Sequence, residues 1–370
     1  MKKNIYYVVC WDKIKEKTWS GTAWNLFKAL SSKIDMVTVD VSCVKPTLYR
    51  RLKNYFGSKY KPELDLGLLG KQKKNVNKKI SEKSCVFQFT EYVCDTLFRS
   101  TYIYIDMNLD YLVFLAKKAP DVFVKSSYSY DQLPKISARA SQQNLYFKEC
   151  SGIFTMGRWV ADDLVNRLGI PKEKVHCVGG GISLDKQNVK PKNKTGNKIL
   201  FIGRDFIRKG GVETYEAFKL LKNKIKNVEL YVAGPKVNPY PSSEVDGYHF
   251  IGDCDRSKII DLLNTCDIFC MPSFYEAYGL VFIEALAFGL PCIGRNCFEM
   301  PYFIEEGKTG LLLYNNDINE YVDKMFNLLN NSEIKDNVKR LKDFYFEHYS
   351  WNNVAQKIIK TIQRDETHKK

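Results

Sequence analysis

Short runs of β-branched and aromatic residues alternate with helical patterns along most of the chain, and this alternation constrains the fold more than any other feature. The runs are NIYYVVC, IDMVTVDV, CVFQF, TYIYI, DVFVK and GIFTM in the first half, and KILFIG, VELYVA, YHFI and DIFCMP in the second. Strands that alternate with helices form parallel βαβ units. We therefore predict an α/β fold built on parallel sheets.

A polar stretch divides this pattern into two series. Residues 189–198, VKPKNKTGNK, are rich in lysine and have no apolar periodicity, which is typical of a linker. The length of 370 residues also favours two domains over a single core. We predict domains at residues 1–188 and 199–348 that face each other across a cleft, with a ligand at the carboxyl ends of both sheets.

Charge and cysteine usage narrow the class of protein. The net charge of +15 favours an anionic partner, such as nucleic acid, an acidic membrane surface or a phosphorylated small molecule. The 11 cysteines include no C-x-x-C pair, which favours reduced, buried thiols in a cytoplasmic protein over a zinc site. The sequence contains no run of 18 apolar residues and therefore predicts no membrane-spanning helix. The run IYYVVCW is typical of a first strand rather than of a secretory signal.

Residues 45–80 carry 11 basic residues against Glu63 and Asp65. Within them, the apolar residues of LYRRLKNYF fall on one helical face and the basic residues on the other. Such a helix can lie on an anionic membrane, which would make the protein peripheral at the inner face of a membrane. It can equally be a solvated helix that packs its apolar face inside the protein. The sequence leaves both interpretations open.

The segment MPSFYEAYGLVFIEALAFGLPCIG, residues 271–294, predicts a strand end, a turn and a helix that Gly289 ends. The amino terminus of this helix, after Gly279, is a suitable seat for a phosphate. Glu276 in the turn and Glu284 inside the helix can accept hydrogen bonds from sugar hydroxyls. Each glutamate alone also has a structural explanation, since one would favour the helix dipole and the other would be solvated.

A second basic loop follows the strand KILFI, where Gly203 and Arg204 precede Lys209 by a short loop. Arg204 offers a planar fork and Lys209 a compact charge, so the two cations could neutralise a diphosphate without metal. The alternative is a solvated basic surface.

Taken together in this order, the motifs resemble the retaining glycosyltransferases of family 4, which have the GT-B fold of two Rossmann-like domains. GRDFIRKGG resembles the family's G-R-x-x-x-x-K-G loop, YVAGP its V-x-G strand, and YEAYGLVFIEALAFGLP its signature of two glutamates eight residues apart. In the first half, WSGTAWNLFKAL resembles the glycine loop and first helix more weakly. The resemblance covers nearly the whole chain and implies that residues 349–370 form a helix returning to the first domain.

The resemblance implies that Arg204 and Lys209 hold the diphosphate of a UDP- or GDP-sugar, Glu284 binds the ribose, and Glu276 touches the donor sugar. Further donor contacts would come from Gly203, from the backbone N–H groups of Tyr278, Gly279, Leu280 and Val281, and from Gly21 of the first domain. The implied reaction is retaining transfer to a saccharide or lipid-linked saccharide in polysaccharide or glycan assembly. No cofactor and no metal are expected.

The sequence departs from the family in lacking a histidine beside the donor sugar. His176 lies in the apolar run KVHCV and is expected to be a core residue. Asp106, directly after TYIYI, is the candidate contact to the acceptor or donor sugar, with a helix N-cap as its alternative. Tyr128, Tyr130 and Asp131 are weaker candidates for an acceptor groove.

Asp253 and Asp255 superficially form a D-x-D metal motif, but Asp255 precedes a helix and is expected to cap it.

Three rival functions remain. One is a nucleotide-sugar epimerase of the same fold, and another is an inactive sugar-binding homologue. The third, a nucleic-acid-binding protein, has only the net charge in its favour, and no nucleic-acid partner is expected.

Overall fold

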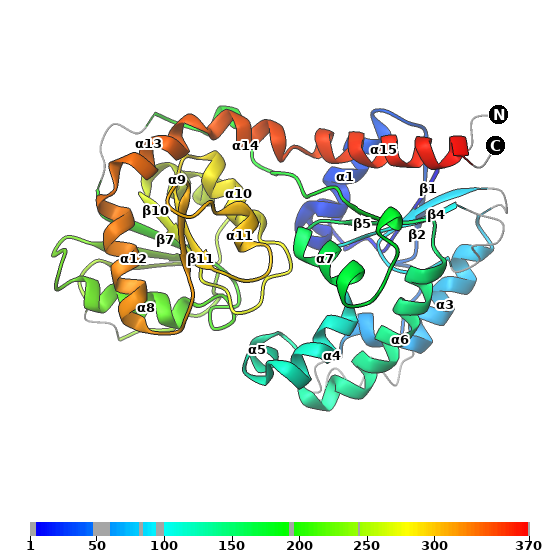
Figure 1. Cartoon of the computed structure of the whole chain (residues 1–370), viewed down its shortest axis with the longest axis horizontal. Coiled ribbons are helices and arrows are strands. Elements are labelled where there is room, and N and C mark those ends of the chain that lie inside the picture. Colours follow the sequence, from blue (N-terminus) through cyan, green and yellow to red (C-terminus); the bar gives the residue numbers. More distant parts are fainter. Residues whose placement is uncertain are drawn as a thin grey trace. The chain divides into compact units, whose positions relative to one another are not determined.

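The computed structural model describes residues 5–46, 60–80, 84–93, 100–191, 196–242 and 245–368. The chain divides into two compact units, each built on its own sheet (Figure 1). The first unit comprises Met1–Val124, Tyr128–Gly181 and Trp351–Lys370, and the second comprises Lys125–Ser127 and Ile182–Ser350. The predicted α/β class is confirmed.

Within the described residues, the first unit contains a six-stranded parallel sheet in the order β2-β1-β3-β4-β5-β6. Its strands are β1 (Ile5–Val9), β2 (Met36–Asp40), β3 (Cys85–Gln88), β4 (Ser100–Ile105), β5 (Gly152–Thr155) and β6 (Val175–Cys177). The helices are α1 (Thr22–Ser31), α3 (Leu66–Asn77), α4 (Leu109–Lys118), α5 (Pro120–Lys125), α6 (Leu133–Glu149), α7 (Arg158–Asn166) and α15 (Trp351–His368). Every residue of β3, β4 and β5 is buried, as expected for central strands of a parallel sheet covered on both faces.

A row of aromatic rings forms part of this core. Tyr7 stacks on Phe87 with ring centroids 5.6 Å apart, and Phe87 stacks on Phe154 at 6.0 Å. Phe154 in turn stacks on Tyr102 at 5.5 Å. The aromatic residues of the predicted strands therefore pack against one another across the sheet.

Helix α15 returns to the first unit, as predicted, and packs beside α1 (Figure 1). Its last turns are fixed by two side-chain hydrogen bonds to β4. Ser100 Oγ donates to Glu366 Oε1 at 2.5 Å, and the Tyr102 hydroxyl donates to Asp365 Oδ2 at 3.1 Å.

The prediction of a strand at DVFVK was wrong, because these residues form the short helix α5. Pro120 opens this helix, where its missing N–H costs no hydrogen bond. The N–H of Phe123 bonds to the carbonyl of Ala119 at 3.0 Å. β4 pairs directly with β5, so the segment belongs to the crossover between neighbouring strands and not to the sheet.

Within the described residues, the second unit contains a six-stranded parallel sheet in the order β12-β11-β10-β7-β8-β9. Its strands are β7 (Lys198–Ile202), β8 (Glu229–Ala233), β9 (Tyr248–Gly252), β10 (Ile268–Cys270), β11 (Cys292–Arg295) and β12 (Gly310–Leu313). The helices are α8 (Gly211–Leu221), α9 (Arg256–Thr265), α10 (Leu280–Ala287), α11 (Met300–Phe303), α12 (Ile318–Asn330), α13 (Ser332–Arg340) and α14 (Lys342–His348). The strand order reverses between β7 and β10, which is where open α/β sheets bind ligands beyond the carboxyl ends of their strands.

The structure describes only part of the basic segment, residues 45–80. The amphipathic stretch LYRRLKNYF, residues 48–56, lies outside the described residues. The neighbouring helix α3 buries Leu68, Leu69 and Val76 and exposes Lys71 and Lys74. In the described ranges no helix is long and apolar enough to cross a membrane.

The described cysteines are free thiols, and half of them are buried. The expectation that the thiols are buried was wrong for Cys10, Cys43 and Cys177, which are exposed. Cys177 is the last residue of β6, Cys10 directly follows β1, and Cys43 lies three residues beyond β2.

Candidate functional site

The loops that follow β7 and β10 meet at the reversal of strand order. The N–H of Phe274 donates to the carbonyl of Arg208 at 2.9 Å, and Arg208 Nη1 donates to the carbonyl of Tyr275 at 2.7 Å. Two motifs that lie about 70 residues apart in the sequence are thus brought into direct contact, at the edge where a ligand is expected.

Lys209 and Glu276 form an ion pair between these loops. Their side chains are only 13% and 8% exposed, and Ser273 Oγ also donates to Glu276 Oε2 at 3.1 Å. Burial, assisted by the nearby Arg208, lowers the pKa of Lys209, while Glu276 acts in the opposite direction. Charges in so dry a place interact far more strongly than they would in water.

Close backbone contact between the two loops depends on glycine. Gly210 has a φ of +76°, and a Cβ there would lie 2.4 Å from the carbonyl oxygen of Pro272. A Cβ at Gly203 would lie 2.9 Å from Lys209 Cγ. The lysine can therefore reach Glu276 because the loop in front of it carries no side chains at these two positions.

The predicted phosphate seat lies at the amino terminus of α10, beside the ion pair. Gly279 is the N-cap with a φ of +93°, and a Cβ there would lie 3.2 Å from Glu276 Cγ. The N–H groups of Leu280 and Val281 belong to the first helical turn, where no carbonyl within the helix can accept from them. Tyr278 is buried with its ring edge-on to Phe303, at 5.0 Å between centroids.

Glu284 lies further along α10 and is half-buried. Burial raises the pKa of this carboxyl group to about 7, although Arg256 and the backbone of Ser183 both act to lower it. Arg256 Nη1 also donates to the Ser183 carbonyl at 2.9 Å. The carboxyl group therefore changes protonation state close to neutral pH.

Arg204 differs from Lys209 in its surroundings. Its side chain is 83% exposed, and Arg204 Nε lies 3.8 Å from Asp253 Oδ1. The two cations of the loop thus have different carboxylate partners in this structure. The N–H of Lys258 donates to Asp255 Oδ1 at 2.9 Å, which confirms Asp255 as the N-cap of α9.

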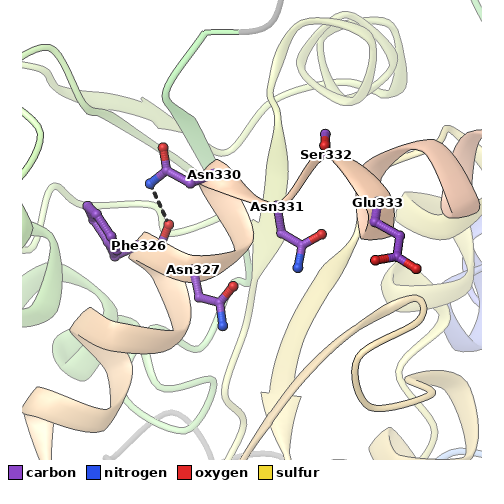
Figure 2. A pocket seen from close by; sticks show the side chains of 6 residues that line it. All are labelled: Phe326, Asn327, Asn330, Asn331, Ser332 and Glu333. Atoms are coloured by element: carbon purple, nitrogen blue, oxygen red, sulfur yellow. Dashed lines mark hydrogen bonds between the residues drawn. The ribbon is translucent and has the colours of Figure 1, made fainter.

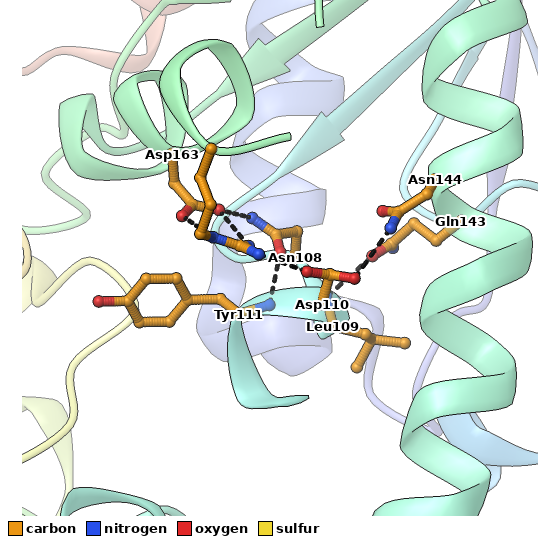
Figure 3. A network of polar contacts seen from close by, with 8 residues as sticks. Asn108, Leu109, Asp110, Tyr111, Gln143, Asn144 and Asp163 are labelled. Carbon is orange, nitrogen blue, oxygen red and sulfur yellow. Dashed lines mark hydrogen bonds and ion pairs between the residues drawn. The ribbon is translucent and has the colours of Figure 1, made fainter. Parts of the chain in front are cut away.

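Asp106 directly follows β4 in the first unit, as predicted, but it does not cap the next helix. That role belongs to Asn108, whose Oδ1 accepts from the N–H of Tyr111 at 2.8 Å (Figure 3). Asn108 Nδ2 donates to Asp163 Oδ2 at 2.8 Å, and Asp163 also binds Arg167. The asparagine one residue before the helix was the signal that identifies the cap.

Tyr128 lies near Asp106, so the structure brings two predicted residues of the first unit together. Burial, followed by the carboxylates of Glu63 and Asp106, raises the pKa of the Tyr128 phenol. The phenol donates to Glu63 Oε1 at 3.4 Å, and Lys61 Nζ lies 4.5 Å from the ring centroid. Tyr130 instead donates to the carbonyl of Ala116 at 3.2 Å. Asp131 is exposed in the 3-10 turn Tyr130–Gln132.

Gly21 lies in the loop before α1, and the expectation of a core histidine was wrong for His176, which is only half-buried because β6 is an edge strand. Gly21 is the N-cap of α1 with a φ of +88°, and it follows Trp19 and Ser20, which also have left-handed backbone. His176 lies in β6 with its ring 5.8 Å from that of Phe154, and burial lowers its pKa.

A separate pocket of about 580 Å³ lies where α12 meets α13 (Figure 2). It is lined by Phe326, Asn327, Asn330, Asn331, Ser332 and Glu333. Two of its amides are fixed by the helix ends, since Asn330 Nδ2 donates to the Phe326 carbonyl and Asn331 Oδ1 accepts from the N–H of Ile334. The pocket contains none of the predicted site residues.

Residues 183–343 match the family described as "Glycosyl transferases group 1". A Klebsiella pneumoniae relative, an uncharacterized 41.2 kDa protein of the cps region, is 31% identical over 42% of this chain and 46% of its own length. The N,N'-diacetylbacillosaminyl-diphospho-undecaprenol alpha-1,3-N-acetylgalactosaminyltransferase of Campylobacter jejuni is 25% identical over 63% of each protein. The chain thus spans about half to two thirds of the length of these curated relatives.

Among solved structures, Anabaena HepE in complex with UDP and glucose superimposes with a TM-score of 0.63. The match covers 98% of this chain and 99% of that one at 13% sequence identity, so the likeness is one of fold. The GT-B fold expected from the sequence is confirmed. The joined loops and α10 lie within residues 183–343, the region that matches the group 1 glycosyl transferases.

Proposed function

We propose that the chain is a retaining glycosyltransferase of family 4 that moves a sugar from a nucleotide-sugar donor to a saccharide or lipid-linked saccharide. The observation that carries this proposal is the buried Lys209–Glu276 pair beside the amino terminus of α10. A cation and a helix start at the reversal of strand order together suit a nucleotide diphosphate.

In this proposal, Lys209 and the first N–H groups of α10 stabilise the negative charge that develops on the leaving diphosphate. Glu276 then exchanges Lys209 for hydroxyl groups of the donor sugar. The exposed Arg204 turns from Asp253 to the diphosphate, and Glu284 accepts from the ribose. The acceptor hydroxyl attacks from the face that the diphosphate leaves. The lysine, the arginine and the helix start supply the positive charge, so no metal ion is required.

The known relatives support a choice of nucleotide and acceptor to test first. HepE was solved with UDP and glucose, so UDP is the first nucleotide to test, ahead of GDP. The Campylobacter relative is named for a sugar on diphospho-undecaprenol, which supports a lipid-linked acceptor. The net charge of +15 and the 11 basic residues of 45–80 support binding to an anionic membrane surface.

Calorimetric titration with UDP and with GDP in chelator tests the donor site. We expect metal-free binding of one nucleotide, weakened by about tenfold or more in Lys209→Ala because a charge-assisted contact is lost. Lys219→Ala is the matched control, since Lys219 is an exposed lysine of the same unit that pairs with Glu216. Absence of binding by the wild type, or equal binding by Lys209→Ala, would contradict the proposal.

A further inference from the structure

Arg295, the last residue of β11, is a charged residue in the core of the second unit, with only 8% of its surface exposed. Its guanidinium group donates in three directions. Nε donates to the carbonyl of Pro272 at 2.9 Å, Nη1 to Asn316 Oδ1 at 2.5 Å, and Nη2 to the Tyr321 hydroxyl. Burying a charge is costly, and these three hydrogen bonds offset part of that cost.

The flat face of the guanidinium group is also in contact. Its Cζ lies 3.8 Å from the centroid of the Phe274 ring, and the Tyr321 ring lies 5.7 Å away. Arginine stacked on an aromatic ring gains cation–π attraction as well as packing. Arg295 therefore holds the loop after β10 by its backbone at Pro272 and by its side chain at Phe274.

We infer that Arg295 is a positioning residue for Glu276. Pro272 and Phe274 lie four and two residues before Glu276, and the other side of the same loop is bound by Arg208 at Tyr275. The carboxylate is thus presented to Lys209 by a loop fixed from β11 and α12 on one side and from the loop after β7 on the other. This inference rests on the proposed function only for its catalytic consequence.

The electrostatic surroundings of Cys297 agree with a short distance between Arg295 and Glu276. Burial raises the pKa of this thiol to about 12, while the Arg295 charge acts to lower it and the Glu276 charge to raise it. The two charged side chains therefore both act on one thiol. A lysine in place of Arg295 would offer a point charge without the planar fork, and it could not make the three bonds and the stacked contact together.

Hydrogen exchange of the loop tests the positioning directly and does not depend on any substrate. We expect peptides covering residues 271–279 to exchange about tenfold faster or more in Arg295→Lys, because the loop opens locally at low cost once its anchor is lost. Tyr321→Phe removes one bond and should give a smaller increase. Peptides from β8 and the exposed-surface variant Arg340→Lys serve as controls. Unchanged exchange of the loop in Arg295→Lys would overturn the inference.

Kinetics separate this role from a merely structural one. The probe is release of the nucleotide from UDP-glucose, UDP-N-acetylglucosamine and GDP-mannose. In Arg295→Lys we expect kcat to fall by about 10- to 100-fold, as slight misplacement of a reacting group does, while the Kd for UDP changes little. The double variant Arg295→Lys/Glu276→Gln should be no slower than Glu276→Gln, since both changes act through one carboxylate.

The outcomes distinguish the inference from the proposed function. A wild type that binds no nucleotide and hydrolyses no donor refutes the proposed function, and the exchange experiment then decides the positioning by itself. Equal rates of donor hydrolysis by the wild type and by Arg295→Lys would refute the inference but not the proposed function. Additive losses in the double variant would likewise refute it, because they would place Arg295 outside the action of Glu276.

Discussion

Lys209 and Glu276 form an ion pair that joins two loops from separate sequence motifs. The lysine lies in the loop after β7, and the glutamate lies in the loop after β10. An anion that binds Lys209 must therefore compete with a carboxylate of the protein.

Glu276→Gln should separate binding from turnover. The substitution removes the competing carboxylate, so we expect UDP to bind at least as tightly as it does to the wild type. Donor turnover should fall by about 100-fold, since in the proposed function this carboxylate is the group that contacts the donor sugar. Calorimetry and nucleotide release measure the two effects on the same preparation. If UDP binding weakened as much as turnover, the proposed exchange of Lys209 for donor-sugar hydroxyls by Glu276 would be contradicted.

Lys209→Ala should also destabilise the fold. Removal of the lysine leaves the Glu276 carboxylate buried without its counterion, which costs about 3–5 kcal/mol. Urea denaturation of Lys209→Ala measures this loss. In Lys209→Ala/Glu276→Gln most of it should be recovered, because no charge is then left unpaired. A double variant as unstable as the single one would show that packing, and not charge, dominates here.

Gly210→Ala should be more damaging than an alanine at another left-handed glycine. At Gly210 the new Cβ would lie 2.4 Å from the Pro272 carbonyl oxygen, in addition to the strain of a φ of +76°. Gly169 has a similar φ of +68° with nothing within 4 Å of its ideal Cβ, so it is the matched control. We expect a loss of about 1 kcal/mol in the control and several times more at Gly210. Equal losses in urea denaturation would mean that the two loops are not in close contact.

Glu284 should make stability depend on pH. Its carboxyl pKa is raised from 4.5 to about 7 in the folded chain, so the folded state binds more protons than the unfolded state between these values. Stability should therefore fall as pH rises from about 4.5 to 7, by an amount on the order of 2 kcal/mol. Glu284→Gln lacks this titration, so the stability of the wild type should fall relative to that of the variant over this pH range. Parallel profiles for the two proteins would contradict the raised pKa.

The sequence was sufficient for most of the strands and for both loops of the site. It did not reveal that Lys209 and Glu276 pair, because that contact depends on β7 and β10 being neighbours in the sheet, which no local pattern records. Arg295 was missed for a similar reason. It is a single basic residue at the end of a short apolar run, and its partners lie before and after it in the chain.

Residue type accounts for two strands that were not predicted. CIGR in β11 and GLLL in β12 have at most one β-branched residue and no aromatic residue, unlike the equally short CVFQ in β3 and GIFT in β5. DVFVK was mistaken for a strand because a run of valine and phenylalanine also suits one turn of helix. The cap at Asn108 was overlooked because Asp106 stands nearby with the same capping chemistry.

The hydrogen bonds between α15 and β4 join residues 263 and 266 positions apart. During synthesis, the strands of the first unit leave the ribosome long before the helix that covers them. The second unit, nearly all of it within residues 182–350, is complete before α15 is made. Domains usually fold as units while the chain emerges, so the later part of this chain is the first to have all of its residues. The nascent first unit therefore has one flank uncovered until α15 has been synthesised.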